Sequence, residues 1–232
     1  ETGLFFSFEL DEGGGVIWLI DHFNQNRNDI LNMYSPVVEE IKPAEVKTYK
    51  QYTQEQMRSL SQQAVVLLKY TETFVVMRFP DGHSIKQKYA PFYKEEGNWY
   101  LKRPEGLMPI YYKDAEGPVL ISEGEKATLG ANCLYEGPTA TWHGGVNSWR
   151  KADWSPIFGK NIIIWPDNDE AGFKCAEELS EYLTEHKCSV QIAKIPEALN
   201  DKDDLYDAYY RNIYTKESFK EYLESSLPKP KK

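Results

Sequence analysis

The second half of the chain alternates short apolar runs with longer amphipathic stretches. The runs at 119–122, 139–142 and 162–165 have the length of β-strands, and the third is fully apolar, as expected for a parallel strand covered on both faces. Between positions 170 and 187, apolar side chains recur every three to four residues, which predicts an amphipathic helix. Strands that alternate with helices in this way predict a parallel α/β sheet. Further elements are expected at 125–132 (helix), at 190–194 (strand) and after Thr215 (helix).

The first half of the chain has a different pattern, in which apolar runs are joined by turn residues. Two such runs, at 4–10 and 16–23, flank a stretch that contains three glycines in a row, and this arrangement predicts a β-hairpin. Thr53 and Gln56 have the spacing of a capping box, so we expect a helix to begin there. From 73 to 112 the pattern is typical of β-strands with a Pro-Asp-Gly turn between them.

These patterns divide the chain into four parts. Residues 1–41 are expected to form a hairpin followed by a short helix, the outline of a ribbon without metal ligands. Residues 42–117 are expected to form a smaller α+β subdomain that is basic and rich in aromatic residues. Residues 118–227 hold the α/β pattern, and the Pro- and Lys-rich residues 228–232 read as a linker or tail.

The charge of the chain is uneven along its length. The 232 residues include 27 Lys and Arg against 36 Asp and Glu, for a net charge of −9. Residues 42–103, however, contain eleven basic and six acidic residues, whereas 1–41 and 104–232 are each net acidic by seven charges. A basic block of this kind indicates either an anionic partner or simply a solvated surface.

Composition excludes several classes of protein. An aromatic content of 14% is too high for a disordered chain. No apolar run approaches the roughly 20 residues that span a bilayer, and no hydrophobic secretory segment opens the chain, so we expect an intracellular protein with no membrane partner. Three cysteines without CxxC spacing argue against a disulfide framework and against a cysteine-rich zinc site.

Acidic residues follow the predicted parallel strands at the point where each strand ends. Glu123 comes directly after the first strand, and Asp167 and Asp169 come after the third. Because the carboxyl ends of parallel strands meet at one edge of a sheet, we expect these carboxylates to lie close together. Carboxylates held close repel one another unless a cation lies among them, and Mg²⁺ prefers such oxygen ligands. A further acidic cluster after the last strand contains Asp201, Asp203 and Asp204.

At these residues the sequence resembles the TOPRIM domain, the catalytic domain shared by bacterial-type primases, topoisomerases and some nucleases. Residues 119–124 match the motif hhhhEG with Ser122 as the one polar departure, and residues 162–172 match hhhhxDxDxxG. The closer similarity is to primases of phages and mobile elements. It rests on EGEKA at 123–127, GG.N.WRKADWSP..G at 144–159 and WPDNDEAG at 165–172.

The resemblance implies a fold and a set of roles. The fold would be a Rossmann-like, mainly parallel sheet flanked by helices, preceded by the smaller basic subdomain. Glu123 would be a metal ligand or general base, and Asp167 and Asp169 the metal-binding pair. We assign Asp201 as the third metal ligand, with Asp203 and Asp204 as the alternatives. The cofactor would be Mg²⁺ or Mn²⁺.

Two groups of residues are candidates for binding nucleotides or nucleic acid. Gly144 and Gly145 would allow backbone amides to approach a phosphate, although the same loop could be purely structural and pinned by Trp149 and Trp154. In the basic block, cations alternate with aromatic side chains, a combination that neutralises phosphates and stacks bases but also occurs in ordinary cores. The candidates are Lys126, Asn147, Arg150 and Lys151 near the acids, and Lys86, Lys88, Lys102 and Arg103 in the basic block.

These features lead to the hypothesis of a DNA primase core from a phage, plasmid or integrated element. It would join nucleoside triphosphates on a single-stranded DNA template at the replication fork, beside a replicative helicase that is fused or separate. The alternatives are a TOPRIM nuclease, which would share the acids, and a non-catalytic nucleic-acid-binding module of a primase-helicase. A topoisomerase is the least favoured alternative, since its tyrosine-bearing domain does not fit in 232 residues.

Overall fold

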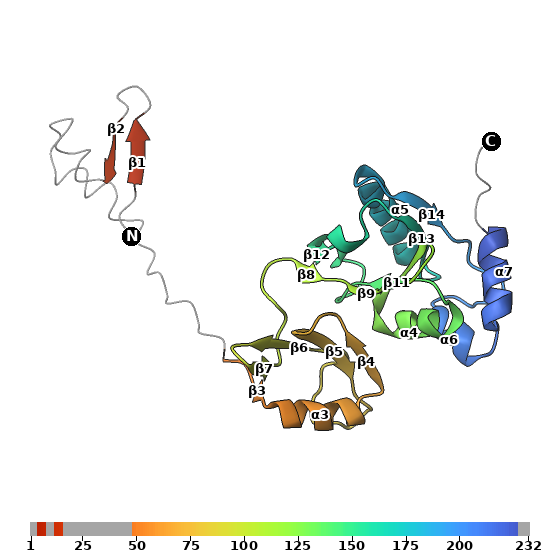
Figure 1. Ribbon diagram of the computed structural model, residues 1–232, viewed down its shortest axis with the longest axis horizontal. Coiled ribbons are helices and arrows are strands. Elements are labelled where there is room, and N and C mark those ends of the chain that lie inside the picture. Colours follow the sequence, from red (N-terminus) through yellow and green to blue (C-terminus); the bar gives the residue numbers. More distant parts are fainter. Residues whose placement is uncertain (1–3, 8–11, 16–47, 227–232) are drawn as a thin grey trace. The chain divides into compact units, whose positions relative to one another are not determined.

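The structure is a computed structural model that describes residues 4–7, 12–15 and 48–226 (Figure 1). The chain separates into two compact units, Glu1–Thr48 and Tyr49–Lys232. The division predicted at 41/42 and 117/118 stays a prediction.

In the first unit, β1 (Leu4–Ser7) pairs antiparallel with β2 (Glu12–Gly15). The hairpin is therefore present, but its second strand is the glycine-rich stretch that was predicted to be the turn. Strand pairing uses backbone groups, which glycine supplies as other residues do. The apolar run 16–23 and the short helix expected after Asn28 lie outside the described residues.

The second unit begins with a five-stranded antiparallel sheet in the order β3-β7-β6-β5-β4. Helix α3 covers one of its faces and begins at the predicted capping box, in which Thr53 accepts from the Gln56 amide and the Gln56 side chain accepts from the Thr53 amide. Met57 is the buried residue of α3 and packs with Phe92 and Trp99 of the sheet. The elements are β3 (Gln51–Tyr52), α3 (Gln54–Gln63), β4 (Val66–Lys69), β5 (Phe74–Arg78), β6 (Ala90–Glu95) and β7 (Asn98–Tyr100).

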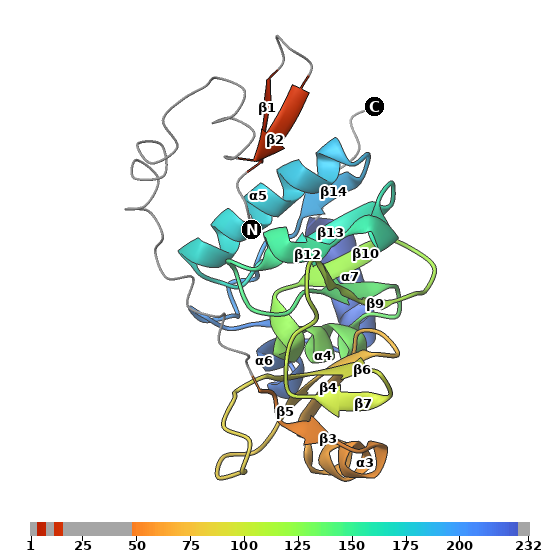
Figure 2. The ribbon, with the colours of Figure 1, turned by 90° about the vertical axis from the view of Figure 1, so that its left-hand side faces the viewer.

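A second five-stranded sheet has the order β14-β13-β10-β11-β9. All of its pairings are parallel except that of the edge strand β9 with β11. Figure 2 shows α5 and α7 beside these strands, and α4 and α6 next to each other. The α/β prediction for this region is confirmed, including its mainly parallel sheet. The elements are β9 (Tyr111–Lys113), β10 (Val119–Ser122), α4 (Gly124–Leu134), β11 (Thr139–Thr141), β13 (Asn161–Trp165), α5 (Glu170–Glu185), β14 (Ser189–Ile192), α6 (Leu205–Tyr210) and α7 (Lys216–Ser226).

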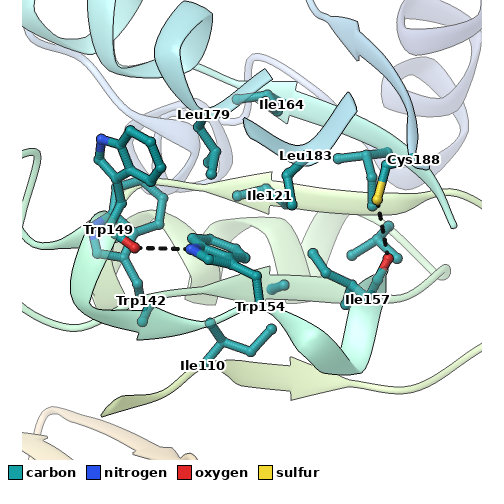
Figure 3. Packing of buried hydrophobic residues seen from close by; sticks show 14 of the residues in the cluster. Ile110, Ile121, Trp142, Trp149, Trp154, Ile157, Ile164, Leu179, Leu183 and Cys188 are labelled. Atoms are coloured by element: carbon teal, nitrogen blue, oxygen red, sulfur yellow. Dashed lines mark hydrogen bonds between the residues drawn. The ribbon is translucent and has the colours of Figure 1, made fainter. Parts of the chain in front are cut away.

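Two hydrophobic clusters lie on the two faces of this sheet. On one face, Leu179 and Leu183 of α5 pack with Ile121 and Ile164 of the strands (Figure 3). On the other face, residues of α4, α6 and α7 pack around Leu120, which explains why the central strands are apolar on both sides. A short parallel pair is formed by β8 (Met108–Pro109) and β12 (Ala152–Asp153). Among the described residues, no helix is both long enough and apolar enough to cross a membrane.

The long segment between β11 and β13 is anchored by tryptophans. Trp142, Trp149 and Trp154 are all buried in the cluster shared with α5. The Trp154 indole donates to the Trp149 carbonyl at 2.9 Å, and farther along the Cys188 thiol donates to the Ile157 carbonyl at 3.4 Å (Figure 3). This segment is therefore packed into the core. That agrees with the alternative in which the loop is structural and is held in place by Trp149 and Trp154.

Gly130 lets α6 lie against α4. A methyl group at Gly130 would lie 2.4 Å from the backbone carbonyl of Leu205, which is closer than side-chain atoms approach backbone. Alanine normally favours a helix interior over glycine by about 1 kcal/mol. Here we expect alanine to destabilise the protein instead, because overpacking of this kind costs about 1–3 kcal/mol. Denaturant unfolding of Gly130→Ala should show a lower free energy of unfolding, and a value equal to or above that of the wild type would contradict this close contact.

Candidate acidic active site

Glu123 and Asp167 follow the ends of two neighbouring strands of the sheet. Ser122 of β10 is paired in register with Trp165 of β13, so the segments that carry Glu123 and Asp167 emerge next to each other. Glu123 is the N-cap of α4, and its side chain makes no capping hydrogen bond. Gly124 follows with a φ of +77°, a conformation that permits the sharp turn into the helix.

The Glu123 carboxyl is half-buried among other acids. Burial, and next the charge of Asp169, raise its pKa to about 7, while a hydrogen bond from the Val146 backbone amide acts in the opposite direction. Glu123 is thus held near the protonation midpoint at neutral pH, as suits a group that accepts or donates a proton.

The Asp167 carboxyl is the most perturbed of the acids. Burial raises its pKa to about 8, and the charges of Glu123, Asp204 and Asp169 add to the effect. Its Oδ1 atom is buried and has no hydrogen-bond partner among the described residues. A buried, unpartnered carboxylate oxygen beside like charges is costly, and a hard cation would relieve it.

Asp169 has a second role in the local structure. It is the N-cap of α5, and its Oδ1 accepts from the Gly172 amide at 2.7 Å. Gly172 is required here, because a methyl group in its place would lie 2.5 Å from the Asp167 carbonyl oxygen. The DxDxxG spacing therefore has a structural reason: the glycine lets the helix begin directly against the turn that carries both aspartates.

The third acid beside this site is Asp204. Its charge contributes to the raised pKa of Asp167, whereas Asp201, the residue assigned from the sequence, is exposed in a turn. The Asp203 carboxylate has other partners: it pairs with Arg211 and accepts a hydrogen bond from the Asn200 amide. Asp204 is the N-cap of α6, a helix that the sequence patterns did not predict.

Lys126 is the cation inside this group of acids. Its Nζ lies 2.7 Å from Asp207 Oδ2 and 3.2 Å from Asp204 Oδ2. It also lies 5.4 Å from the centroid of the Tyr206 ring. Lys126 thus neutralises part of the third acidic cluster, and its contact with a phosphate stays a prediction.

The acids are neighbours but do not form a closed set of metal ligands. Within the described ranges, no three His, Cys, Asp or Glu side chains are grouped closely enough to hold a metal ion. Two of the carboxylates have other partners in the protein, since Asp169 caps α5 and Asp204 is paired with Lys126. The donor chemistry nevertheless fits Mg²⁺ or Mn²⁺, because the unpartnered Asp167 oxygen faces further carboxylates.

A glycine loop covers Glu123. Gly144 and Gly145 have φ values of +105° and +74°, and a methyl group at Gly145 would lie 3.9 Å from Glu123 Oε1. The Trp142 indole donates to the Gly145 carbonyl at 2.9 Å and fixes the loop to the core. A methyl group at Gly144 would lie 3.6 Å from Arg103 Nη2, so a cation from the chain after β7 lies beside this loop.

A buried polar cluster lies next to Glu123 and was not found from the sequence. Glu125 is 3% exposed, and its Oε1 accepts from the Tyr70 hydroxyl at 2.9 Å and contacts His143 Nδ1 at 2.7 Å. His143 is equally buried, and its Nε2 has no hydrogen-bond partner in the described part of the chain. The cluster joins the antiparallel sheet, α4 and the end of β11, elements far apart in sequence.

The other predicted binding residues are spread over the surface. Arg150 pairs with Glu178 at 2.8 Å and lies over the Trp149 ring, and Lys102 pairs with Glu95 at 2.6 Å. They are therefore not gathered in one site by the structure. The exposed members are Lys86, Lys88, Arg103, Asn147, Arg150 and Lys151.

Comparison with known families identifies part of this site. Residues 143–206 match a family model described as Toprim-like. The matched range contains Asp167, Asp169 and Asp204, and Glu123 lies before it. Residues 143–206 are thus a Toprim-like domain, as the motifs indicated, and such domains occur in nucleic-acid-processing enzymes and typically bind Mg²⁺. No curated protein matches the chain.

Proposed function

We propose that residues 49–226 form the catalytic core of a DNA primase that joins nucleoside triphosphates on a single-stranded template. The observation that carries the proposal is the buried, unpartnered Asp167 carboxylate beside Glu123 and Asp204 at the carboxyl edge of a Toprim-like sheet. A bound Mg²⁺ or Mn²⁺ would be held by Asp167 with Asp169 or Asp204 and would neutralise charge on the triphosphate.

Glu123 is proposed to act as the general base. In primer synthesis a 3′-hydroxyl oxygen attacks the α-phosphorus of an incoming nucleotide, pyrophosphate leaves, and the hydroxyl proton must be accepted by a nearby group. A carboxyl with a pKa of about 7 is half ionised at neutral pH and matches this task. The covering loop lies against this carboxyl, because a methyl group at Gly145 would lie 3.9 Å from Glu123 Oε1.

The antiparallel sheet and its connections are proposed to bind the template. Arg103 lies beside Gly144, so its guanidinium is near the acids and could contact a phosphate of the strand. Lys86, Lys88 and Lys102 belong to the same net-positive block. Arg78 lies over the Tyr89 ring, 5.8 Å from its centroid, and adds a further cation beside an aromatic ring in this block.

A nuclease would use the same carboxylates with water as the attacking group, so one assay separates the candidates. The protein is incubated with single-stranded DNA, labelled ribo- or deoxyribonucleotides and Mg²⁺ or Mn²⁺. Primer-length labelled products support the proposal. Shortened template would support the nuclease, and neither product, with DNA still bound, would support a non-catalytic module.

Glu123→Gln tests the assigned base within this assay. We expect a rate about 10²–10⁴-fold lower, the usual contribution of general acid–base catalysis, with unchanged affinity for single-stranded DNA. The substitution keeps the size of the side chain, so a folding defect is not expected. Near-wild-type turnover would remove Glu123 from the mechanism, and a matching loss of DNA affinity would assign it to docking instead.

A further inference from the structure

Helix α6 carries three tyrosines toward solvent. Leu205 and Ala208 are fully buried and hold the helix against α4, which leaves the opposite face to Tyr206, Tyr209 and Tyr210. Tyr210 is 72% exposed and Tyr209 is 42% exposed. We call these three residues the tyrosine platform. Exposed aromatic clusters are uncommon on soluble domains and indicate a binding surface.

Two of the three rings of the tyrosine platform are nearly parallel, and the third is inclined to them. The planes of Tyr206 and Tyr210 are 11° apart, with centroids separated by 6.0 Å. Tyr209 stands across them, at 61° to Tyr206. Its hydroxyl lies near the Cys133 thiol of α4. The result is a pair of nearly parallel ring faces with a third ring beside them.

The platform is continuous with the acidic site. The Tyr206 amide donates to Asp204 Oδ1 at 2.8 Å, so the first ring of the platform is two residues from the third acid. Lys126 lies over the Tyr206 ring and contacts Asp204 as well. At the other end, Arg211 follows Tyr210 directly, is 37% exposed at its side chain and pairs with Asp203. A cation therefore lies at each end of the row of rings, and each is paired with an aspartate that a phosphate of the strand would have to replace.

We infer that the tyrosine platform binds unpaired bases of a single-stranded nucleic acid as the strand leaves or enters the acidic site. Sequence-independent single-strand sites combine stacking rings with cations that track the phosphates, and this surface offers both. A protein partner would need a broader apolar surface, whereas no other exposed large hydrophobic residue of the described chain lies on α6 or α7. The inference rests on the proposed function and names a part of the strand's path.

The test compares Tyr210→Ala with Tyr210→Phe. Fluorescence anisotropy measures the binding of a fluorescein-labelled dT oligomer to the full chain at fixed salt. Stacking of one base contributes about 1–3 kcal/mol, so we expect Tyr210→Ala to weaken binding by at least about fivefold. Phenylalanine keeps the ring face and should bind as the wild type does. An abasic oligomer of equal length should bind the wild type and Tyr210→Ala equally, because it has no base to stack.

The outcomes separate the platform from the proposed function. A wild-type protein that does not bind the dT oligomer would overturn both proposals. Wild-type affinity in Tyr210→Ala would overturn the platform alone, and so would an equal loss in Tyr210→Phe, since the hydroxyl would then be the contact. Sedimentation of each variant identifies the rival occupant: self-association lost only in Tyr210→Ala would make the surface an interface between copies of the chain.

Discussion

Asp167→Asn is expected to stabilise the metal-free protein and to abolish the proposed metal-dependent primer synthesis. The ordinary pKa of an aspartate is 3.8, and burial together with neighbouring acids raises that of Asp167 to about 8. Below pH 3.8 the carboxyl is protonated in both the folded and the unfolded state, so it has no effect on stability. As the pH rises from there to about 8, the unfolded chain releases the proton more readily than the folded chain does. The folded state is destabilised progressively, and the cost is complete above pH 8.

Asparagine removes this cost, since it has no charge to bury. A pKa shift of one unit corresponds to about 1.36 kcal/mol, so the gain at pH 8.5 should be on the order of a few kcal/mol and should shrink toward pH 4. Guanidinium unfolding with a chelator present measures it at both pH values. Calorimetry with Mn²⁺ should show lost affinity, and the primer assay should show no product.

Asp201→Asn is the matched control, because it makes the same chemical change at an exposed aspartate. It should leave stability, Mn²⁺ affinity and activity unchanged. If Asp201→Asn weakened Mn²⁺ binding instead, the third acid of the site would be Asp201 after all. Unchanged Mn²⁺ affinity in Asp167→Asn would refute the metal assignment.

Glu125→Ala is expected to lower the free energy of unfolding by about 1–3 kcal/mol for each buried polar group that it leaves without a partner. The Tyr70 hydroxyl and His143 Nδ1 would both lose their acceptor in a region that water does not reach. Glu125→Gln should cost less, because its amide oxygen can still accept one of the two hydrogen bonds. Urea denaturation measures all three proteins.

Glu116→Ala serves as the surface control and should change stability by less than about 0.5 kcal/mol, because Glu116 is exposed. A Glu125→Ala protein that was as stable as this control would show that Tyr70 and His143 find other partners. The buried cluster would then not be what joins the antiparallel sheet to α4.

The sequence predicted well the features that depend on local patterns. The parallel strands followed from runs of apolar residues, and the α3 capping box followed from Thr53 and Gln56. The second strand of the hairpin was predicted less well. In β2 the paired residues are mainly glycines, whose lack of side chains gives no hydrophobic alternation from which a strand could be recognised.

The positions of Glu123, Asp167 and Asp169 at one sheet edge were determined by the sequence itself, because each directly follows a parallel strand and strand direction fixes where its end lies. Which of the three later aspartates lies beside Asp167 follows only from the tertiary structure, and the third metal ligand stays a prediction. Asp201, Asp203 and Asp204 are nearly adjacent in sequence, and the close packing of α6 on Gly130 brings Asp204 toward Asp167. The same holds for Tyr70, Glu125 and His143, whose hydrogen bonds join residues up to 55 positions apart. Local patterns carry no information about such contacts, since these depend on which helix and sheet surfaces pack together.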